Sequence, residues 1–316
     1  MKKRTFQILK IIIALAAYGY IAWKIYDYRL HAYNFFLNYR LDVLKISLIL
    51  ITFLLMPINW LIEAIKWRKL VDNFTKINLK HSFKAVLVGI STGIFTPNRI
   101  GEFAGRPYFT DNTKITSGVF AGFAGSLAQS MVTVFSGIIA LNFYLFSGQI
   151  VFISKISYFF EVLVFSILFI LILIYIFFHL EKLIKLKRYI RFFKKYENEL
   201  LFLKKYASHD LFLVLFYSLL RYLTFFIQYF LLLRAFEVNI QLIDAFVSVA
   251  SVYLFLFAIP ALAFSEIGIR SSLAVFFIGM YSANLSGIFA ASILLWFINL
   301  AIPAVLGTLV LLSSKE

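Results

Sequence analysis

Two stretches far apart in the chain read TPNRIGEFAGR, residues 96–106, and PALAFSEIGIR, residues 260–270. Each interrupts an apolar run at a proline and continues through a glutamate and a glycine to an arginine. A charged side chain at membrane depth costs roughly 2.5–3.5 kcal/mol on insertion scales, so neither cluster can face lipid without a compensating partner. We therefore expect both stretches to face protein, water or a polar ligand.

The composition around these stretches is that of an integral membrane protein. Hydrophobic residues make up 62% and charged residues 15% of the 316 residues, and the mean hydropathy is +0.89. Soluble domains carry about a quarter charged residues. The apolar runs have helical length, whereas an outer-membrane barrel would show short alternating segments. The sequence predicts an all-α, polytopic transmembrane helical bundle.

Six apolar runs are long enough to predict full membrane spans, since a spanning helix needs about 20 residues. They lie at residues 8–26, 44–62, 115–146, 158–178, 211–233 and 285–311. Two further segments, 85–110 and 245–280, are interrupted. The apolar piece between Lys84 and Pro97 would form only about 18 Å of helix, against a hydrocarbon core of about 30 Å. We expect that piece not to cross.

The basic residues behind the formal net charge of +16 gather at the N-terminus and in two loops, 63–84 and 179–210. The positive-inside rule predicts that all three are cytoplasmic. With both loops on one side, segment 85–110 must enter and leave by that side, as a re-entrant hairpin. We expect the 179–210 connection to form either a short amphipathic helix on the membrane surface or a solvated charged loop. This charge pattern suits anionic lipid, and nucleic acid is not expected as a partner.

The order of elements divides the chain into two membrane halves. The first half is expected at 1–157, with its re-entrant segment at 85–110, and the second at 158–316, with its broken segment at 245–280.

The two halves align at their interrupted segments. Setting Phe83 against Phe246 places Pro97 against Pro260, and a glutamate, a glycine and an arginine follow in both. An inverted-topology repeat with paired broken segments predicts a binding site at mid-membrane, where the two segments meet. The alternative is two unrelated loop motifs beside ordinary spans.

Eight residues are the candidates for binding substrate. They are Arg99, Gly101, Glu102, Arg106, Arg221, Glu266, Gly268 and Arg270. A helix starting after Pro97 would place Arg99, Glu102 and Arg106 on one face, with the carboxylate between two guanidiniums. Such a trio either closes the hairpin as an ion network or leaves an arginine fork for a phosphate. Gly101, together with Gly105, would permit close backbone approach.

In the second half Glu266 and Arg270 stand at i, i+4, with Gly268 between them, which predicts an intrahelical ion pair. Arg221 falls near the middle of a predicted span and should point into the bundle. Its expected partner is Glu102, Glu266 or a substrate phosphate, and a fixed structural ion pair is the alternative.

Four polar residues at span positions are weaker candidates, because interhelical hydrogen bonds are common packing devices. They are Asn59, Glu63, Gln129 and Gln228.

Several classes of chemistry are not expected. The chain has no cysteine, and its four histidines are far apart without ligand spacing, so we expect no metal. No nucleophile–base set and no phosphate-binding loop is present, so neither an enzyme nor a cofactor is predicted. An intramembrane transferase using Glu102 or Glu266 as acid would have to work beside arginines, which favour an ionised carboxylate.

At three motifs the chain resembles the flippase-like transmembrane family typified by the membrane domain of lysylphosphatidylglycerol synthases, which includes stand-alone members. The motifs are KWRKL at 66–70, TPNRIGE at 96–102 followed by Arg106, and FSEIGIR at 264–270. Family members often follow the last arginine with glutamate, whereas Ser271 follows here. The soluble aminoacyl-transferring domain of the full-length synthases is not expected, nor is synthesis of lysyl lipid.

The resemblance implies a multi-pass protein of the inner membrane that moves an anionic or aminoacylated phospholipid, or a lipid-linked substrate, between leaflets. The two clusters would line the headgroup path, membrane lipids would be the partners, and a lipid-synthesising enzyme is considered as a protein partner. An ion-coupled carrier of a small anion and a transferase acting on a lipid are the alternatives.

Overall fold

The computed structural model describes residues 37, 39–94, 96, 99–110, 114–147, 159–182, 201–259 and 263–313. Within these residues the chain is helical and forms no strand, which confirms the predicted all-α bundle. The expected first span at 8–26 lies outside the described residues. So do the division between the halves near residue 157 and most of the 179–210 connection.

The long helices are α2 (Val43–Val71), α5 (Ile115–Ser147), α7 (Phe159–Phe178), α10 (Ser208–Ala235), and α13 (Leu285–Trp296) continued by α14 (Ile302–Ser313). A π-helical turn, Phe297–Ala301, joins the last two. Within the described ranges, five helical stretches are long and apolar enough to cross a membrane. They match the predicted spans, and the chain is a multi-pass membrane protein.

Helix α2 departs from the prediction, because it continues well past residue 62. Lys66 was expected in a cytoplasmic loop, but it lies within α2 and its side chain is only 1% exposed. The helix continues because Trp60, Ala64 and Trp67 extend its buried face through the charged residues. The connection between α2 and α3 is therefore short.

Two pairs of shorter helices occupy the interrupted segments. The first is α3 (Leu79–Gly93) with α4 (Gly101–Gly105), which runs on into the 3-10 turn η2 (Arg106–Phe109). The second is α11 (Leu242–Ala258) with α12 (Ala263–Ile278). Helix α3 begins earlier than residue 85 because the Asn78 side chain caps its first turn. Its 15 residues still make only about 22 Å of helix.

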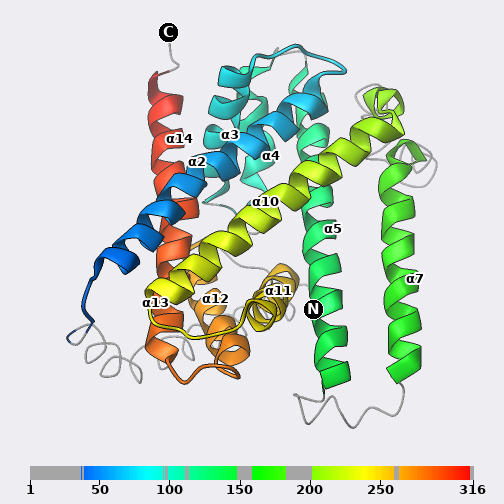
Figure 1. Ribbon diagram of the computed structural model, residues 1–316. Helices are drawn as coiled ribbons and strands as arrows, with labels where there is room; N and C mark the ends of the chain where they lie inside the picture. The colour runs from blue at the N-terminus through cyan, green and yellow to red at the C-terminus, as the bar shows by residue number, and fades with distance from the viewer. Residues whose placement is uncertain are drawn as a thin grey trace, which may run out of the picture.

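The two short pairs lie toward opposite ends of the bundle (Figure 1). Helices α3 and α4 lie at the end where α2 finishes and α5 starts, whereas α11 and α12 lie where α10 finishes and α13 starts. The chain therefore enters and leaves each pair at one end. A re-entrant hairpin would take this path, and its position in a bilayer stays a prediction.

Packing between the halves is reciprocal. Helix α2 packs along α10, α3 packs against α14 of the second half, and α11 packs against α5 of the first. Each short pair is thus held by a long helix from the other half. A two-fold-related repeat predicts this exchange, although its inverted orientation remains a prediction.

A tyrosine fixes the start of α10 to the end of α2. The Tyr206 hydroxyl donates a 2.5 Å hydrogen bond to the carbonyl oxygen of Leu70. Burial raises the pKa of Tyr206, which keeps the hydroxyl protonated as a donor. The crossing of α2 and α10 is therefore closed at this end by a specific contact.

Candidate functional site

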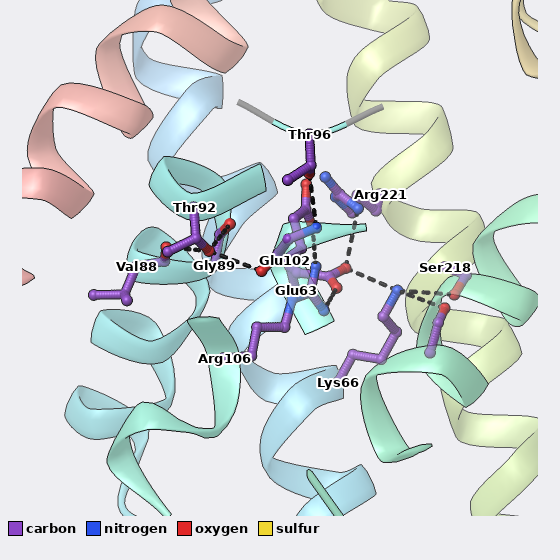
Figure 2. Close-up of polar contacts among 12 residues, drawn as sticks. Glu63, Lys66, Val88, Gly89, Thr92, Thr96, Glu102, Arg106, Ser218 and Arg221 are labelled. Atoms are coloured by element: carbon purple, nitrogen blue, oxygen red, sulfur yellow. Dashed lines mark hydrogen bonds and ion pairs between the residues drawn. The ribbon is translucent and has the colours of Figure 1, made fainter. Parts of the chain in front are cut away.

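The carboxylate of Glu63 on α2 is one of the most buried charged groups in the part of the chain that the structure describes. It lies 2.8 Å from Lys66 Nζ, 2.6 Å from Arg106 Nη1 and 3.1 Å from Arg221 Nη1 (Figure 2). These cations come from α2, η2 and α10, and the Glu63 side chain is only 1% exposed. A carboxylate removed this far from water is tolerated only with such partners. The contact therefore ties three elements together.

Arg106 extends this network to α4. Its Nη2 atom lies 2.6 Å from Glu102 Oε2, so the guanidinium bridges two carboxylates. Gly89 of α3 makes room for the side chain, since a Cβ there would lie 2.6 Å from Arg106 Cγ. We call Glu63, Lys66, Glu102, Arg106 and Arg221 the Glu63 cluster.

Three further contacts, with α5, α10 and α2, fix the positions of Lys66 and Arg221. Lys66 Nζ donates to Ser218 Oγ at 3.3 Å and to the Gly125 carbonyl at 3.4 Å. The Arg221 guanidinium lies over the Trp60 ring, 4.5 Å from its centroid, which is cation–π geometry. The Glu63 cluster is thus held by α2, α5 and α10 together.

Glycines bring α3 and α4 close enough to position Glu102 and Arg106. A Cβ on Gly101 would lie 2.3 Å from the Thr92 carbonyl oxygen, and one on Gly105 would lie 2.2 Å from Thr92 Oγ1. Thr96 Oγ1 accepts a 2.7 Å hydrogen bond from the Gly101 backbone N–H across the break. The predicted close approach at Gly101 and Gly105 is confirmed.

Arg99 lies in the break between α3 and α4 and contacts the second half of the chain. Its Nη2 atom lies 2.8 Å from Glu266 Oε2 and 3.0 Å from Oε1. The trio expected to share one helix face is therefore divided, since Glu102 pairs with Arg106 and Arg99 pairs with Glu266. Arg99 has a positive φ of 57°, so the helical i, i+3 spacing does not apply there. The left-handed backbone directs the side chain to α12.

The second cluster is smaller. Glu266 also pairs with Arg270 one turn further along α12, as its i, i+4 spacing predicted. Arg270 Nη1 donates to the Tyr253 hydroxyl on α11 at 3.3 Å. Gly268 lies between the pair on α12 and is half-buried. We call Arg99, Glu266 and Arg270 the Glu266 cluster.

Cations outnumber carboxylates in these two clusters. In the part of the chain that the structure describes, five cationic side chains meet three carboxylates, giving a formal charge of +2. Exposure is uneven, because the Arg106 side chain is 2% exposed and that of Arg99 is 28% exposed. Arg99 is therefore the accessible cation and Arg106 an enclosed one.

The whole network falls within one family match. A family model described as "Lysylphosphatidylglycerol synthase TM region" matches residues 8–307. The chain belongs to this family. Searches against curated proteins and against solved structures gave no significant match in either. Membership of a family of lipid-synthase membrane regions indicates a lipid-related membrane protein.

The ion-pair partner of Arg221 differs from the prediction. Arg221 pairs with Glu63, not with Glu102 or Glu266. The sequence makes Glu63 only a weak candidate and predicts a loop at Lys66, so sequence reasoning misses the centre of the first cluster. Their i, i+3 spacing at the end of an apolar run, with Lys66 inside the KWRKL motif, was the available signal.

The amide side chains act as interhelical contacts, as expected. Asn59 Nδ2 donates to Asn299 Oδ1 at 3.2 Å, and Gln228 Nε2 donates to the Thr52 carbonyl at 3.0 Å. Gln129 Nε2 donates to the Ser218 carbonyl at 3.3 Å. These residues support the helices around the two clusters.

Metal ligands are not grouped in the described ranges, where no set of three or more histidine, aspartate or glutamate residues could hold an ion.

Proposed function

We propose that this protein is a transporter that moves a phospholipid or lipid-linked substrate, with an anionic or aminoacylated headgroup, between the leaflets of the inner membrane, and that it is not an enzyme. The observation that carries the proposal is the ion pair between Arg99 and Glu266. It joins the broken segments of the two halves, and it is the more exposed part of a network rich in cations.

The proposed binding step is an exchange of partners at Arg99. Guanidinium binds carboxylate and phosphate oxygens in the same forked geometry, so a headgroup phosphate can replace Glu266 as the partner of Arg99. That exchange would release the contact between the two broken segments and open a path for the headgroup. The acyl chains would stay in the bilayer throughout.

The Glu63 cluster is proposed to act as the fixed wall of this path. Its ion pairs link α2, α4, η2 and α10 at distances of 2.6–3.1 Å, and its central carboxylate is enclosed. Arg221, whose side chain is 14% exposed, would be the next cation that a phosphate meets after Arg99.

The same proposal includes an orientation of the protein in the membrane and a source of its lipid substrate. The N-terminus and the connections within 63–84 and 179–210 would be cytoplasmic, and a lipid-synthesising enzyme on that side would supply substrate. The sequence holds no ATP-binding motif, so movement would be passive, gradient-driven or driven by a partner.

The test is lipid movement by purified protein in liposomes. A tail-labelled phospholipid is placed in both leaflets, and a membrane-impermeant quencher reports exchange between them. We expect wild-type protein to exceed protein-free liposomes, Arg99→Gln to be slower, and Arg40→Gln, an exposed position outside both clusters, to match wild type. Wild-type movement equal to that of protein-free liposomes for every headgroup would overturn the proposal.

A further inference from the structure

The carboxylates of the two clusters are already paired with cations. Glu63 contacts three cations, Glu102 contacts Arg106, and Glu266 contacts Arg99 and Arg270. A headgroup ammonium needs a carboxylate oxygen as its partner, so it would have to displace one of these cations. A displaced guanidinium stays charged and would be left unpaired at membrane depth. The site is therefore poorly suited to a cationic headgroup.

The arginines of the two clusters, in contrast, have hydrogen-bond donors that are not used. Among the described residues, the Nε atoms of Arg106, Arg221 and Arg270 are buried and have no hydrogen-bond partner. An incoming negative charge would accept hydrogen bonds from these guanidiniums, and such bonds are strongest between charged partners.

The solvent exposure of the side chains also favours an anionic headgroup. The Arg99 side chain is 28% exposed, whereas the Glu266 and Glu102 side chains are each 12% exposed. A headgroup approaching the contact between the halves therefore meets a cation before it meets a carboxylate. The formal surplus of +2 then favours a ligand with net negative charge.

We infer that the substrate is a phospholipid whose headgroup is a phosphate diester with net negative charge and no ammonium group, and that Arg99 followed by Arg221 binds the phosphate. This inference rests on the proposed transport function and narrows its substrate class. It selects the anionic headgroup over the aminoacylated one.

The experiment compares headgroups on otherwise identical lipids. The full chain is reconstituted in phosphatidylcholine liposomes that contain tail-labelled phosphatidylglycerol, phosphatidylethanolamine or lysyl-phosphatidylglycerol at the same trace amount. We expect phosphatidylglycerol to move at least about tenfold faster than lysyl-phosphatidylglycerol, which corresponds to about 1.4 kcal/mol of discrimination. Phosphatidylethanolamine should fall between them or match the slower lipid.

Two results would count against the inference in different ways. Lysyl-phosphatidylglycerol moving as fast as phosphatidylglycerol, or faster, would overturn the headgroup assignment and leave transport intact. No lipid moving faster than in protein-free liposomes would overturn the transport function itself.

Variants of Arg99 test whether this residue causes the preference for phosphatidylglycerol over lysyl-phosphatidylglycerol. Arg99→Gln should slow phosphatidylglycerol and bring its rate toward that of lysyl-phosphatidylglycerol, whereas Arg40→Gln should keep the wild-type ratio. If Arg99→Gln does not fold, Arg99→Lys keeps the charge without the fork and should retain a reduced preference for phosphatidylglycerol. An unchanged ratio in a folded Arg99→Gln variant would overturn the role of Arg99.

A separate arm distinguishes a lipid phosphate from free phosphate. Liposomes with the same protein are given radioactive inorganic phosphate outside, and uptake is measured against protein-free liposomes. We expect uptake no faster than in protein-free liposomes. Uptake above that level would assign the site to a soluble anion and overturn the assignment to a lipid.

Discussion

The two halves of the molecule carry the same short motif in different surroundings. Glu102 and Arg106 in the first half, and Glu266 and Arg270 in the second, are i, i+4 ion pairs in the helix that follows a break. In the first half Arg106 also binds the buried Glu63, whereas in the second half Glu266 also binds the more exposed Arg99. One pair is thereby fixed to the core, whereas under the proposed function the other exchanges its partner.

The number of cations around each carboxylate explains the difference. Glu63 has three cationic partners from three elements, so moving any one of them leaves the other two in place. Glu266 has two, and one of them comes from the opposite half. Desolvated ion pairs are costly to break, so the larger cluster should behave as support and the smaller one as the moving contact.

The largest expected effect comes from removing the central carboxylate. Glu63→Gln leaves Lys66, Arg106 and Arg221 without their shared partner and should lower the free energy of unfolding by about 3–5 kcal/mol. The free energy of unfolding is measured in mixed detergent micelles, with unfolding followed by circular dichroism. The matched control is Glu237→Gln, which removes the half-exposed partner of Lys45 and should lower the free energy of unfolding much less than Glu63→Gln does. Equal losses in both variants would remove the supporting role of the Glu63 cluster.

The next effect tests the packing of α3 on α4. Gly101→Ala would place a Cβ 2.3 Å from the Thr92 carbonyl oxygen and should cost about 1–3 kcal/mol by forcing the helices apart. Gly122→Ala on α5 is the control, because its Cβ would meet its nearest neighbour, Phe103, at an ordinary 3.4 Å. The control should be neutral or slightly stabilising, since alanine favours helix over glycine. A Gly101→Ala variant as stable as Gly122→Ala would contradict the close approach.

A smaller effect on stability, with a clear effect on transport, is expected at Glu266. Glu266→Gln frees Arg99 from its competing carboxylate, so the half-saturating concentration of phosphatidylglycerol should fall by up to about tenfold. The loss of stability should be less than half that of Glu63→Gln. Transport rates over a range of lipid concentrations provide the first value and detergent unfolding the second. A rise in the half-saturating concentration would indicate that Glu266 itself helps to bind the headgroup.

The smallest expected effect is the direct coupling between Arg99 and Glu266. A double-mutant cycle with Arg99→Ala and Glu266→Ala should give an interaction energy of about 0.5–1 kcal/mol, low because the pair is partly exposed. The same cycle on Arg106 and Glu63 should give a larger value. A larger coupling at Arg99 would reverse the comparison between the clusters.

The spans could be predicted from the sequence because apolar length is a local property. The predicted span 115–146 and the observed α5 almost coincide, and the same holds for 285–311 and the joined α13 and α14. The end of α2 could not be predicted in this way. Hydropathy falls at Glu63 and Lys66, and only the tertiary ion pairs show that the helix continues buried through them.

Ion pairs within one helical turn could be predicted from the sequence, whereas ion pairs between distant segments could not. Spacing correctly indicated the pairs Glu102–Arg106 and Glu266–Arg270, since both lie within one turn of continuous helical backbone. It failed for Arg99, because the positive φ at this residue interrupts the helical periodicity. The pairing of Arg221 with Glu63 depends on how α10 crosses α2, which no local pattern encodes.

The most direct test of the exchangeable contact uses the absence of cysteine in this chain. The Arg99→Cys and Glu266→Cys substitutions are combined, and the two thiols are joined by a short bifunctional methanethiosulfonate, which attaches through disulfide bonds that a reductant breaks. Phosphatidylglycerol movement is then measured before and after reduction. The single-cysteine variants treated with the same reagent are the controls. Because the double variant lacks Arg99, its uncross-linked form should move phosphatidylglycerol at the reduced rate of Arg99→Gln. We predict that cross-linking stops this remaining movement and that reduction restores it. Undiminished movement in fully cross-linked protein would contradict the exchange of partners between the two halves.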